Sequence, residues 1–558
     1  MRNRGRRRSI ACLIRAATGS TMLGGRPVTT RIHMCFRPFA LAAAVAALVC
    51  AGPGAAMEGS IQERARALGD AAEIYAQRDF APIWTGEAAA RGAALVAELR
   101  DADAHALPPS RYAPDRLAAL LQSGPQDEAE IALSRAFLLY ARDLSSGLLE
   151  PRDAARGVRH RAPRPSPALL LRRAAETEDL TALMAALAPS DSGYARLATT
   201  YAELRAVAER GGWGAPVSPG PTLREGDRGP RVVEIRRRLA AMGDAEDEAV
   251  LTPADPTVFD AALAQLVRAF QARHGLNTDA AVGPRTLAAL NASPEKRAAQ
   301  VAVNLERLRW MNRPLGDRRI MVNQADFTVR LIDGADVLFE ERVIVGKPRH
   351  QTIEFSDEME YLVLNPTWHV PRSIATEELL PQLKDDPTLL QRRNMRLSRP
   401  DGGPIPFDTA SYDFTAYDAQ SFPYRIRQAP NPDNALGRVK FMFPNDHAIY
   451  LHDTPTRRLF ERDARTFSHG CVRVRDPLRL AEILLGFQME NPRDFIDTVL
   501  AGGRERYVNL AEHIPVHLYY STAWIDDAGR PQFRADVYGR DAAVSAALRA
   551  HGVDAPQI

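Results

Sequence analysis

A single thiol lies in the short segment Ser-His-Gly-Cys, within the stretch TFSHGCVRV. The chain has four cysteines in 558 residues, and the other three lie within the first 50 positions, so Cys471 stands alone in the rest of the sequence. A thiol becomes a strong nucleophile when an imidazole accepts its proton or pairs with it as a cation. His452 is our candidate base, with fifteen residues between it and Ser468. These residues predict nucleophilic catalysis by a cysteine.

Two short strands are needed to bring the imidazole to the thiol. In KFMFPNDHAIYLHD the triplet Pro-Asn-Asp separates two alternating runs, which predicts a hairpin whose second strand covers residues 448–452. The period of two places Tyr450 and His452 on one face of that strand. In CVRV the two valines are expected to face the core, and Cys471 and Arg473 the other side. Both polar pairs are therefore expected to meet in one open groove.

The turn before the thiol supplies further candidate groups. Gly470 allows a close backbone approach, so its amide and that of Cys471 are candidate donors to the oxyanion of a tetrahedral intermediate, typically worth about 3 kcal/mol per donor. We expect Ser468 and His469 to position this turn. Two aspartates are candidates for orienting an imidazole, and the sequence does not choose between them: Asp453 and Asp476.

The N-terminal segment, residues 1–56, is typical of an export signal. It holds nine arginines and no acidic residue, and its apolar run FALAAAVAALVCAG is too short to span a bilayer comfortably. We expect cleavage after Ala56, although a start at Met22 or Met34 would also fit. No later segment predicts a membrane span.

Removal of this leader changes both the charge and the thiol content. The full chain has 72 basic and 69 acidic residues, a net charge of +3; without residues 1–56 the balance is 63 against 69, or −6. No basic excess then favours a nucleic-acid partner. Cys471 also becomes the only thiol, so an intramolecular disulfide is excluded.

The remaining sequence predicts a multidomain α+β protein. Residues 57–210 are rich in Ala and Leu at helical spacing, which predicts a helical scaffold domain, and the Gly- and Pro-rich residues 211–222 predict a linker. Residues 300–541 change to a period of two, which predicts a β-rich domain. Within it, the polar residues 371–425 are long for a connection, so we expect a lid. Residues 542–558 are expected to be a C-terminal tail.

Residues 223–291 resemble a small three-helix peptidoglycan-binding module. Val233, Leu239, Val267 and Phe270 are candidate core positions of two helices, and two glycines are candidate helix ends: Gly243 and Gly275. The module is marked by Gly-Asp-x-Gly-x-x-V, F-Q-x-x-x-G-L and V-G-x-x-T-x-x-x-L segments. The residues that fit these marks are Gly226, Asp227, Gly229, Val232, Phe270, Gln271, Gly275, Leu276, Val282, Gly283, Thr286 and Leu290.

The histidine followed by Ser-His-Gly-Cys resembles the signature of the L,D-transpeptidase catalytic domain of the YkuD type. That signature is a histidine, fourteen to seventeen residues, and then Ser/Thr-His-Gly-Cys. The segments VGKP, YLVLNPTWHVPRSI, IYLHDTP and IPVHLYYSTAW also resemble the larger, multidomain periplasmic members of this family. IYAQRDFAPIW is similar to their helical scaffold domain.

This resemblance implies a specific reaction and specific roles. The cysteine would attack the amide between residues three and four of a peptidoglycan tetrapeptide stem, release D-alanine, and pass the acyl group to an amine of a neighbouring stem, giving a 3→3 cross-link. By motif, Cys471 is the nucleophile, His452 the general base, and His469 with Gly470 belong to the site turn and oxyanion pocket. Sensitivity to carbapenems, a periplasmic location and cell-wall synthesis partners are further implications. No metal and no cofactor is expected.

Four residues are candidates for contact with the substrate: Tyr450, Arg473, Ser468 and Trp368. Arg473 suits a carboxylate of the stem, whereas the two aromatic rings suit groove walls. His369 is expected to be structural or to lie at the hinge of the lid.

Other interpretations of these residues remain. An isolated cysteine is often a small buried hydrophobic residue, and a zinc site is conceivable but lacks known ligand spacing; its ligands would be His447, His452, His469 and Cys471. A hydrolase using the same thioester, such as an L,D-carboxypeptidase or an amidase that releases wall proteins, is one alternative function. A non-catalytic peptidoglycan-binding protein is another. A papain-like peptidase is disfavoured because its cysteine precedes its histidine.

Overall fold

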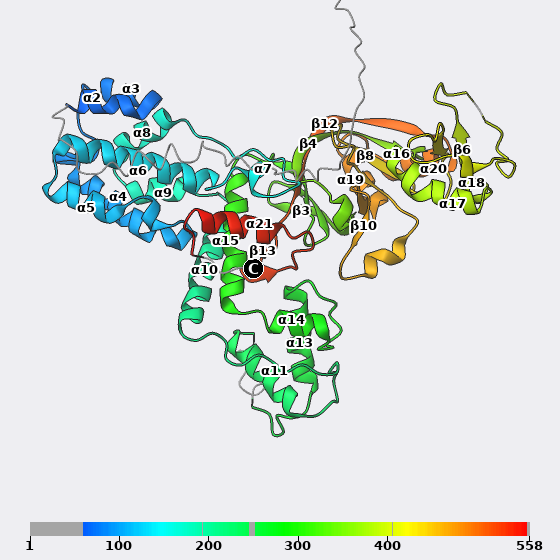
Figure 1. The fold of residues 1–558 in the computed structure, drawn as a ribbon, viewed down its shortest axis with the longest axis horizontal. Helices are drawn as coiled ribbons and strands as arrows, with labels where there is room; N and C mark the ends of the chain where they lie inside the picture. Colours follow the sequence, from blue (N-terminus) through cyan, green and yellow to red (C-terminus); the bar gives the residue numbers. More distant parts are fainter. Residues whose placement is uncertain (1–59, 192, 245–251, 404, 555–558) are drawn as a thin grey trace, which may run out of the picture. The chain divides into compact units, whose positions relative to one another are not determined.

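A computed structural model describes residues 60–191, 193–244, 252–403 and 405–554 (Figure 1). The predicted leader, residues 1–56, lies outside the described residues, as do the three cysteines in it. Within the described ranges, no helix combines the length and apolar character that a membrane crossing needs. A helical N-terminal region is followed by a β-rich C-terminal region, which confirms the multidomain α+β class.

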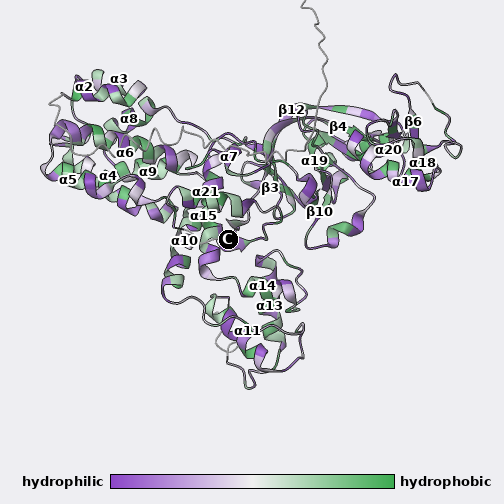
Figure 2. Ribbon diagram, viewed as in Figure 1, coloured by the Kyte–Doolittle hydropathy of each residue, from purple (hydrophilic) through white to green (hydrophobic). Residues whose placement is uncertain are grey.

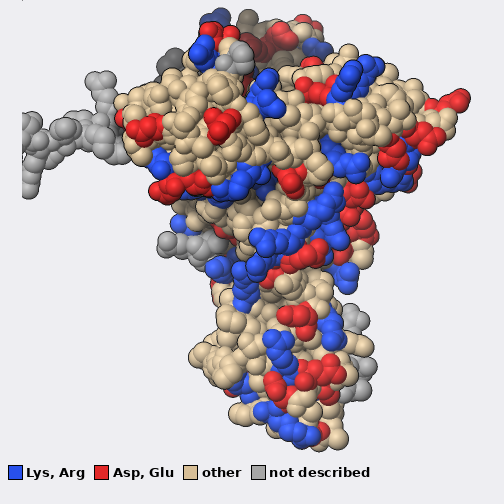
Figure 3. Space-filling view, turned by 90° about the vertical axis from the view of Figure 1, so that its right-hand side faces the viewer, with Lys and Arg blue, Asp and Glu red and all other residues tan. Residues whose placement is uncertain are grey.

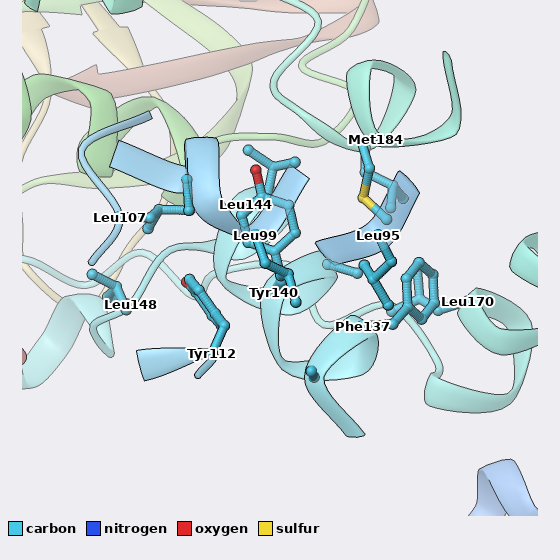
Figure 4. Close-up of a cluster of buried hydrophobic side chains, with 14 of the residues drawn as sticks. Leu95, Leu99, Leu107, Tyr112, Phe137, Tyr140, Leu144, Leu148, Leu170 and Met184 are labelled. Carbon is cyan, nitrogen blue, oxygen red and sulfur yellow. The ribbon is translucent and has the colours of Figure 1, made fainter. Parts of the chain in front are cut away.

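The N-terminal helices pack around α6 (Gln126–Ser146). Phe137, Tyr140 and Leu144 recur at helical spacing and are fully buried, as the sequence pattern predicts. Figure 4 shows them among side chains of neighbouring helices. The other helices of this region are α2 (Ile61–Ala65), η1 (Arg66–Ala71), α3 (Ala72–Ala76), η2 (Gly86–Ala88), α4 (Ala89–Arg100), η3 (Asp101–His105), η4 (Pro109–Arg111), α5 (Pro114–Ser123), α7 (Pro151–Ala154), α8 (Pro167–Glu176), α9 (Leu180–Leu187) and α10 (Tyr194–Glu209).

A buried carboxylate fixes the loop before α4. Glu130 on α6 accepts hydrogen bonds from the backbone amides of Ile83 and Trp84, and from the hydroxyls of Tyr75 and Thr85. A buried carboxylate is costly unless it is hydrogen-bonded in this way, so these four donors make its burial possible.

Three helices of the described residues form the small middle domain after residues 211–222, which contain no helix or strand. They are α11 (Pro230–Ala241), α13 (Ala261–Arg273) and α14 (Pro284–Leu290). Leu239, Val267 and Phe270 are core residues as predicted, but Val233 is only half-buried. Val232, Ile235 and Leu239 form the inward face of α11, and Val233 lies one position beside it. Both predicted helix-ending glycines have positive φ, +73° at Gly243 and +64° at Gly275.

The β-rich domain follows the buried helix α15 (Pro294–Trp310) and contains a nine-stranded sheet. The strand order is β10-β3-β11-β9-β8-β4-β12-β1-β2, and β2 also pairs with β3, so the sheet closes on itself. The strands are β1 (Arg318–Asn323), β2 (Thr328–Asp333), β3 (Asp336–Gly346), β4 (Phe355–Leu364), β8 (Val439–Met442), β9 (Leu451–His452), β10 (Thr466–Ser468), β11 (Val472–Val474) and β12 (Arg506–Tyr519). The short helix η5 (Pro348–His350) follows β3, and η8 (Arg457–Glu461) follows β9. Helices α19 (Pro477–Gly486) and α20 (Pro492–Ala501) contribute apolar residues to the same core.

The predicted lid is a small subdomain inserted between β4 and β8. It has its own apolar core, which includes Leu379, Leu383 and Phe414, and its own three-stranded sheet in the order β5-β7-β6. Its first half is helical as expected, whereas the half predicted as loop contains a strand. The elements are β5 (Trp368–His369), α16 (Arg372–Ile374), the π-helix η6 (Ala375–Leu379), α17 (Leu380–Asp385), α18 (Leu389–Arg392), β6 (Met395–Ser398), η7 (Phe414–Ala416) and β7 (Arg425–Gln428).

The C-terminal residues do not form a loose tail. After β13 (Ala523–Ile525) and β14 (Pro531–Phe533), the helix α21 (Arg540–Ala550) buries Val544 and Leu548 in the core of the N-terminal helices. Hydrophobic and hydrophilic residues are interspersed along this helix, as they are along the neighbouring helices (Figure 2). The expected tail is therefore a packed helix, because apolar residues four positions apart form one face.

Candidate active site

His452 lies on β9, and Cys471 directly precedes the neighbouring parallel strand β11. β9 pairs with β11 so that Leu451 is opposite Val472 and His452 is opposite Arg473. The Val472 amide donates to the Tyr450 carbonyl at 3.0 Å. Leu451 and Val472 are fully buried in the domain core. Alternation then assigns the other face to His452 and Arg473, and Tyr450 and Cys471 each adjoin these strands one residue before they begin.

The Cys471 thiol is half-buried and lies against the segment that precedes β9. Its Sγ–H donates to the Ala448 carbonyl at 3.5 Å. Burial raises the pKa of the Cys471 thiol, while hydrogen bonds from Tyr450 and the charges of Lys440 and Arg473 act in the opposite direction. The thiol form is therefore the resting form at neutral pH, with groups around it that can stabilise the thiolate.

The His452 imidazole is buried and neutral. Burial lowers the pKa of His452 to about 3, and the Arg473 guanidinium acts in the same direction. The backbone of Asp453 and of Leu436 acts on this pKa in the opposite direction. Its Nδ1 atom is buried without a hydrogen-bond partner among the described groups. An unpaired buried nitrogen is costly in a folded protein, and a catalytic role is one recognised reason for its presence.

Neither aspartate that the sequence offered orients this imidazole. The Asp453 carboxylate accepts from the amides of Arg438 and Thr454 and pairs with Arg457. Asp476 caps α19 by accepting from a backbone amide. The prediction of a carboxylate partner for His452 is therefore wrong, because both carboxylates satisfy nearby backbone donors instead.

The turn before the thiol is held by Ser468. Its hydroxyl donates to the Cys471 carbonyl at 2.6 Å and accepts from the Gly470 amide at 3.1 Å. Thr352 donates to the Gly470 carbonyl at 2.8 Å. Ser468 is thus buried within the turn rather than facing a substrate, which corrects its assignment as a substrate contact.

The same hydrogen bonds change the expected oxyanion pocket. The Gly470 amide is already engaged by Ser468, whereas the Cys471 amide has no acceptor among the described groups. Gly470 has φ +114°, a conformation that L side chains rarely adopt. Glycine is therefore required here by the backbone, and the Cys471 amide is the donor left for an oxyanion.

His469 faces the inserted subdomain. Its Nε2 is 2.5 Å from Oε1 of Glu378, which lies on η6. Its ring lies 5.0 Å from that of His350, measured between centroids. Sequence reasoning missed Glu378, because 91 residues separate it from His469 and no local pattern links them.

Two cations line the polar face beside the thiol. Lys440 is paired with His452 across β8 and β9, and its Nζ lies 4.2 Å from the centroid of the Tyr450 ring. Arg473 donates weakly to Thr456 at 3.4 Å, and it forms no ion pair with a carboxylate of the described residues. Lys440 was missed, although its alternation with the buried Phe441 would have placed it on this face.

The remaining predicted residues lie elsewhere. Trp368 belongs to β5 and packs against the core of the inserted subdomain, and His369 is exposed on the same strand. His447 packs edge-on against Phe355. The described residues contain no group of three or more His, Cys, Asp or Glu side chains arranged to hold a metal ion.

Three family models match the chain. Residues 69–200 match a scaffold domain, residues 228–290 match a domain described as "Putative peptidoglycan binding domain", and residues 317–502 match the L,D-transpeptidase catalytic domain named YkuD. The class defined by fold and matches is thus a multidomain protein with a β-rich catalytic-type domain after a scaffold and a peptidoglycan-binding-type domain. The chain carries an L,D-transpeptidase catalytic domain of the YkuD family, joined to a scaffold and a peptidoglycan-binding-type domain.

Two curated proteins are similar to parts of this chain. A "Putative L,D-transpeptidase" of Haemophilus influenzae is 38% identical over 251 residues, which are 44% of this chain and 49% of that protein. The "N-acetylmuramoyl-L-alanine amidase CwlM" of Mycobacterium tuberculosis is 41% identical over 85 residues, 14% of this chain and 21% of that protein. The chain thus spans about half the length of the first relative and about a fifth of the second.

Two solved structures also match at low identity. An L,D-transpeptidase from Stackebrandtia nassauensis is 12% identical with a TM-score of 0.20, covering 55% of this chain and 97% of that one. An L,D-transpeptidase from Xylanimonas cellulosilytica is 16% identical with a TM-score of 0.16, covering 54% of this chain and 100% of that one.

Proposed function

We propose that this protein is an L,D-transpeptidase that forms 3→3 cross-links in peptidoglycan through a thioester on Cys471. The observation that supports it most is the parallel register of β9 and β11, in which His452 lies opposite Arg473, two residues after Cys471. The match of residues 317–502 to the family of this reaction gives the chemistry its substrate class.

Acylation begins from a neutral pair of side chains. The Cys471 proton passes to the unpaired Nδ1 of His452, and Sγ bonds to the carbonyl carbon between stem residue three and D-alanine. The Cys471 amide donates to the resulting oxyanion. The carbon–nitrogen bond then breaks, the proton on His452 moves to the leaving nitrogen, and D-alanine departs with a thioester left on the enzyme.

Transfer reverses these proton movements. The side-chain amine of a second stem gives its proton to His452 and attacks the thioester carbon. The carbon–sulfur bond breaks, and the thiolate takes the proton back from the imidazole. The product is an amide between two residues at stem position three.

The surrounding charges favour the anionic states along this path. Lys440 and Arg473 are both cationic and close enough to lower the pKa of the Cys471 thiol. The Tyr450 side chain also lowers the pKa of this thiol. Stabilising groups that are already in place need no reorganisation during the reaction. We assign Arg473 the further role of meeting a carboxylate of the stem.

The setting that we propose for this reaction is the periplasm. The leader predicted at residues 1–56 would export the chain, and the domain at residues 228–290 would bind the polymer that the catalytic domain modifies. Carbapenem sensitivity follows, since a β-lactam can acylate the same thiol. Basic and acidic side chains are interspersed on the face shown in Figure 3.

The muropeptides formed by the purified protein test this function. Peptidoglycan rich in tetrapeptide stems is incubated with the protein and digested, and the fragments are separated and weighed by mass spectrometry. We expect 3→3 dimers with the natural protein and none with Cys471→Ala. Shortened monomers without dimers would instead indicate a thioester-forming hydrolase, and an unchanged profile would indicate a binding protein.

A further inference from the structure

A carboxylate of the inserted subdomain lies among basic side chains beside the nucleophile turn. Oε1 of Glu378 is 2.5 Å from Nε2 of His469, 3.6 Å from Nζ of Lys347 and 3.6 Å from a guanidinium nitrogen of Arg349. One oxygen therefore meets three donors. We call the three donors, Lys347, Arg349 and His469, the cradle.

The cradle is built on the same backbone as the thiol. The Lys347 amide donates to the Ser468 carbonyl at 2.9 Å, where β10 pairs with the end of β3. His469 precedes Cys471 by two residues in the turn. A group bound in the cradle is therefore fixed relative to the nucleophile, even when the inserted subdomain moves.

Glu378, in contrast, comes from outside this framework. It lies on the π-helix η6, whose neighbouring Leu379 is buried in the core of the inserted subdomain. Single π-helical turns occur frequently at functional sites. Glu378 therefore ties a separately folded element to the turn that holds the thiol.

The negative charge of Glu378 is complementary to the basic side chains of the cradle. Burial would raise the pKa of Glu378, but the hydrogen bond from His469 and the nearby Lys347 ammonium outweigh it, so this pKa lies below its ordinary value. Burial lowers the pKa of His469 despite Glu378. At neutral pH the cradle thus offers two cations and one neutral N–H donor to a single anionic oxygen.

This contact is exposed enough for exchange. The side chain of Glu378 is 32% exposed, that of Lys347 31% and that of Arg349 68%. Ion pairs with this exposure typically contribute between about 0 and 1 kcal/mol. An entering carboxylate that makes the same contacts can therefore replace Glu378 without a large cost.

We propose that Lys347, Arg349 and His469 form a subsite for a carboxylate of the peptidoglycan stem, which Glu378 occupies until the substrate displaces it. This inference rests on the proposed function, because its ligand is the stem peptide. Binding of the donor then releases the inserted subdomain from the turn that carries Cys471. Two stem carboxylates have the required chemistry, that of the terminal D-alanine and that of a diamino-acid side chain.

Binding measurements on a chemically inert protein test the subsite. The full chain with Cys471→Ala is titrated calorimetrically with three synthetic probes: a stem tetrapeptide, its D-alaninamide form, and the form amidated on the diamino-acid side chain. We expect Glu378→Gln to bind the free acid about fivefold more tightly, since the competing carboxylate is gone. The probe in which the recognised carboxylate is amidated should be the only one that does not bind more tightly to the Glu378→Gln variant.

Matched variants separate the charge from the fold. Glu377 is an exposed neighbour on the same π-helix without a contact to the cradle among the described residues, so Glu377→Gln should leave all three affinities unchanged. Arg349→Gln or Lys347→Gln, added to Glu378→Gln, should cancel the gain. Thermal melting of each variant checks that it is folded.

The outcomes distinguish this inference from the function on which it rests. Equal affinity changes for all three probes, no change on Glu378→Gln, or no measurable binding would each overturn the subsite. Carboxylate-dependent binding without 3→3 dimers would keep the subsite and reject the transpeptidase. Formation of 3→3 dimers without carboxylate-dependent binding would keep the transpeptidase and reject the subsite.

Discussion

At the scale of single residues, the structure favours a neutral thiol and a neutral imidazole. His452 is buried with its pKa lowered to about 3, and burial raises the pKa of Cys471. A preformed ion pair, as in many cysteine enzymes, would require the opposite shifts. The base therefore acts when the substrate arrives, as the proton leaves the sulfur.

The pH dependence of alkylation tests this resting state. Because the pKa of the thiol is raised, the thiolate fraction is small at neutral pH and grows as the pH rises above about 8.5, the ordinary thiol value. His452 stays neutral throughout, so no step is expected between pH 5 and 7. The measurement is the rate at which iodoacetamide modifies Cys471 from pH 5 to above about pH 8.5. A high plateau at pH 6 would show an ion pair and contradict the account.

The turn glycine offers a second test at this scale. Gly470→Ala places a side chain at φ +114°, where strain typically costs about 1–3 kcal/mol, although the nearest atom to the new Cβ is 3.8 Å away. We expect the turn to shift and acylation to fall about a hundredfold. Gly226→Ala is a matched control, since that glycine has φ +93° with open space around it and lies outside the catalytic domain. Equal losses in both variants would mean that the effect is not specific to the site.

At the scale of elements, local periodicity predicted what lies within one segment and missed what joins distant ones. Alternation was enough to assign the apolar Leu451 and Val472 to the core face, because the period of two holds along each strand. The contact between Glu378 and His469 depends on how the insertion folds back, which no local pattern encodes. The prediction for α11 was wrong at Val233 because Val232, Ile235 and Leu239 form its apolar face at helical spacing.

The inserted subdomain should respond to mutation independently of the sheet. Leu383 is fully buried in its own apolar core, so Leu383→Ala is expected to cost about 2–5 kcal/mol locally. Limited proteolysis should then cut within residues 371–425 much faster, while the main thermal transition of the protein stays in place. A lowered main transition would show instead that the subdomain and the sheet unfold together.

At the scale of the whole molecule, the C-terminal helix joins regions that are far apart in sequence. Val544 and Leu548 of α21 belong to the core of the N-terminal helices. Arg540, at the start of the same helix, pairs with the buried Glu354 and donates to the Thr352 carbonyl. Thr352 in turn donates to Gly470. The helix α21, which includes the first part of the expected tail, therefore joins the N-terminal core to the support of the nucleophile turn, and the sequence alone did not reveal this.

Removing the charge of Glu354 tests this support. Both side chains of the Glu354–Arg540 pair are nearly fully buried at 2.7 Å, so Glu354→Gln leaves an unpaired cation and should cost about 3–5 kcal/mol. The control is Asp497→Asn, which breaks an exposed pair with Arg493 and should cost at most about 1 kcal/mol. Calorimetric melting compares the two variants. Similar transitions for both would mean that the buried pair contributes little.

The most direct test of the central claim, that Cys471 is the acylated nucleophile with His452 as its base, is mass spectrometry after incubation with a carbapenem. We predict one drug adduct on the natural protein, mapped to Cys471, with slower formation in His452→Gln and none in Cys471→Ala. A natural protein that stays unmodified, or an adduct on any other residue, would contradict the account.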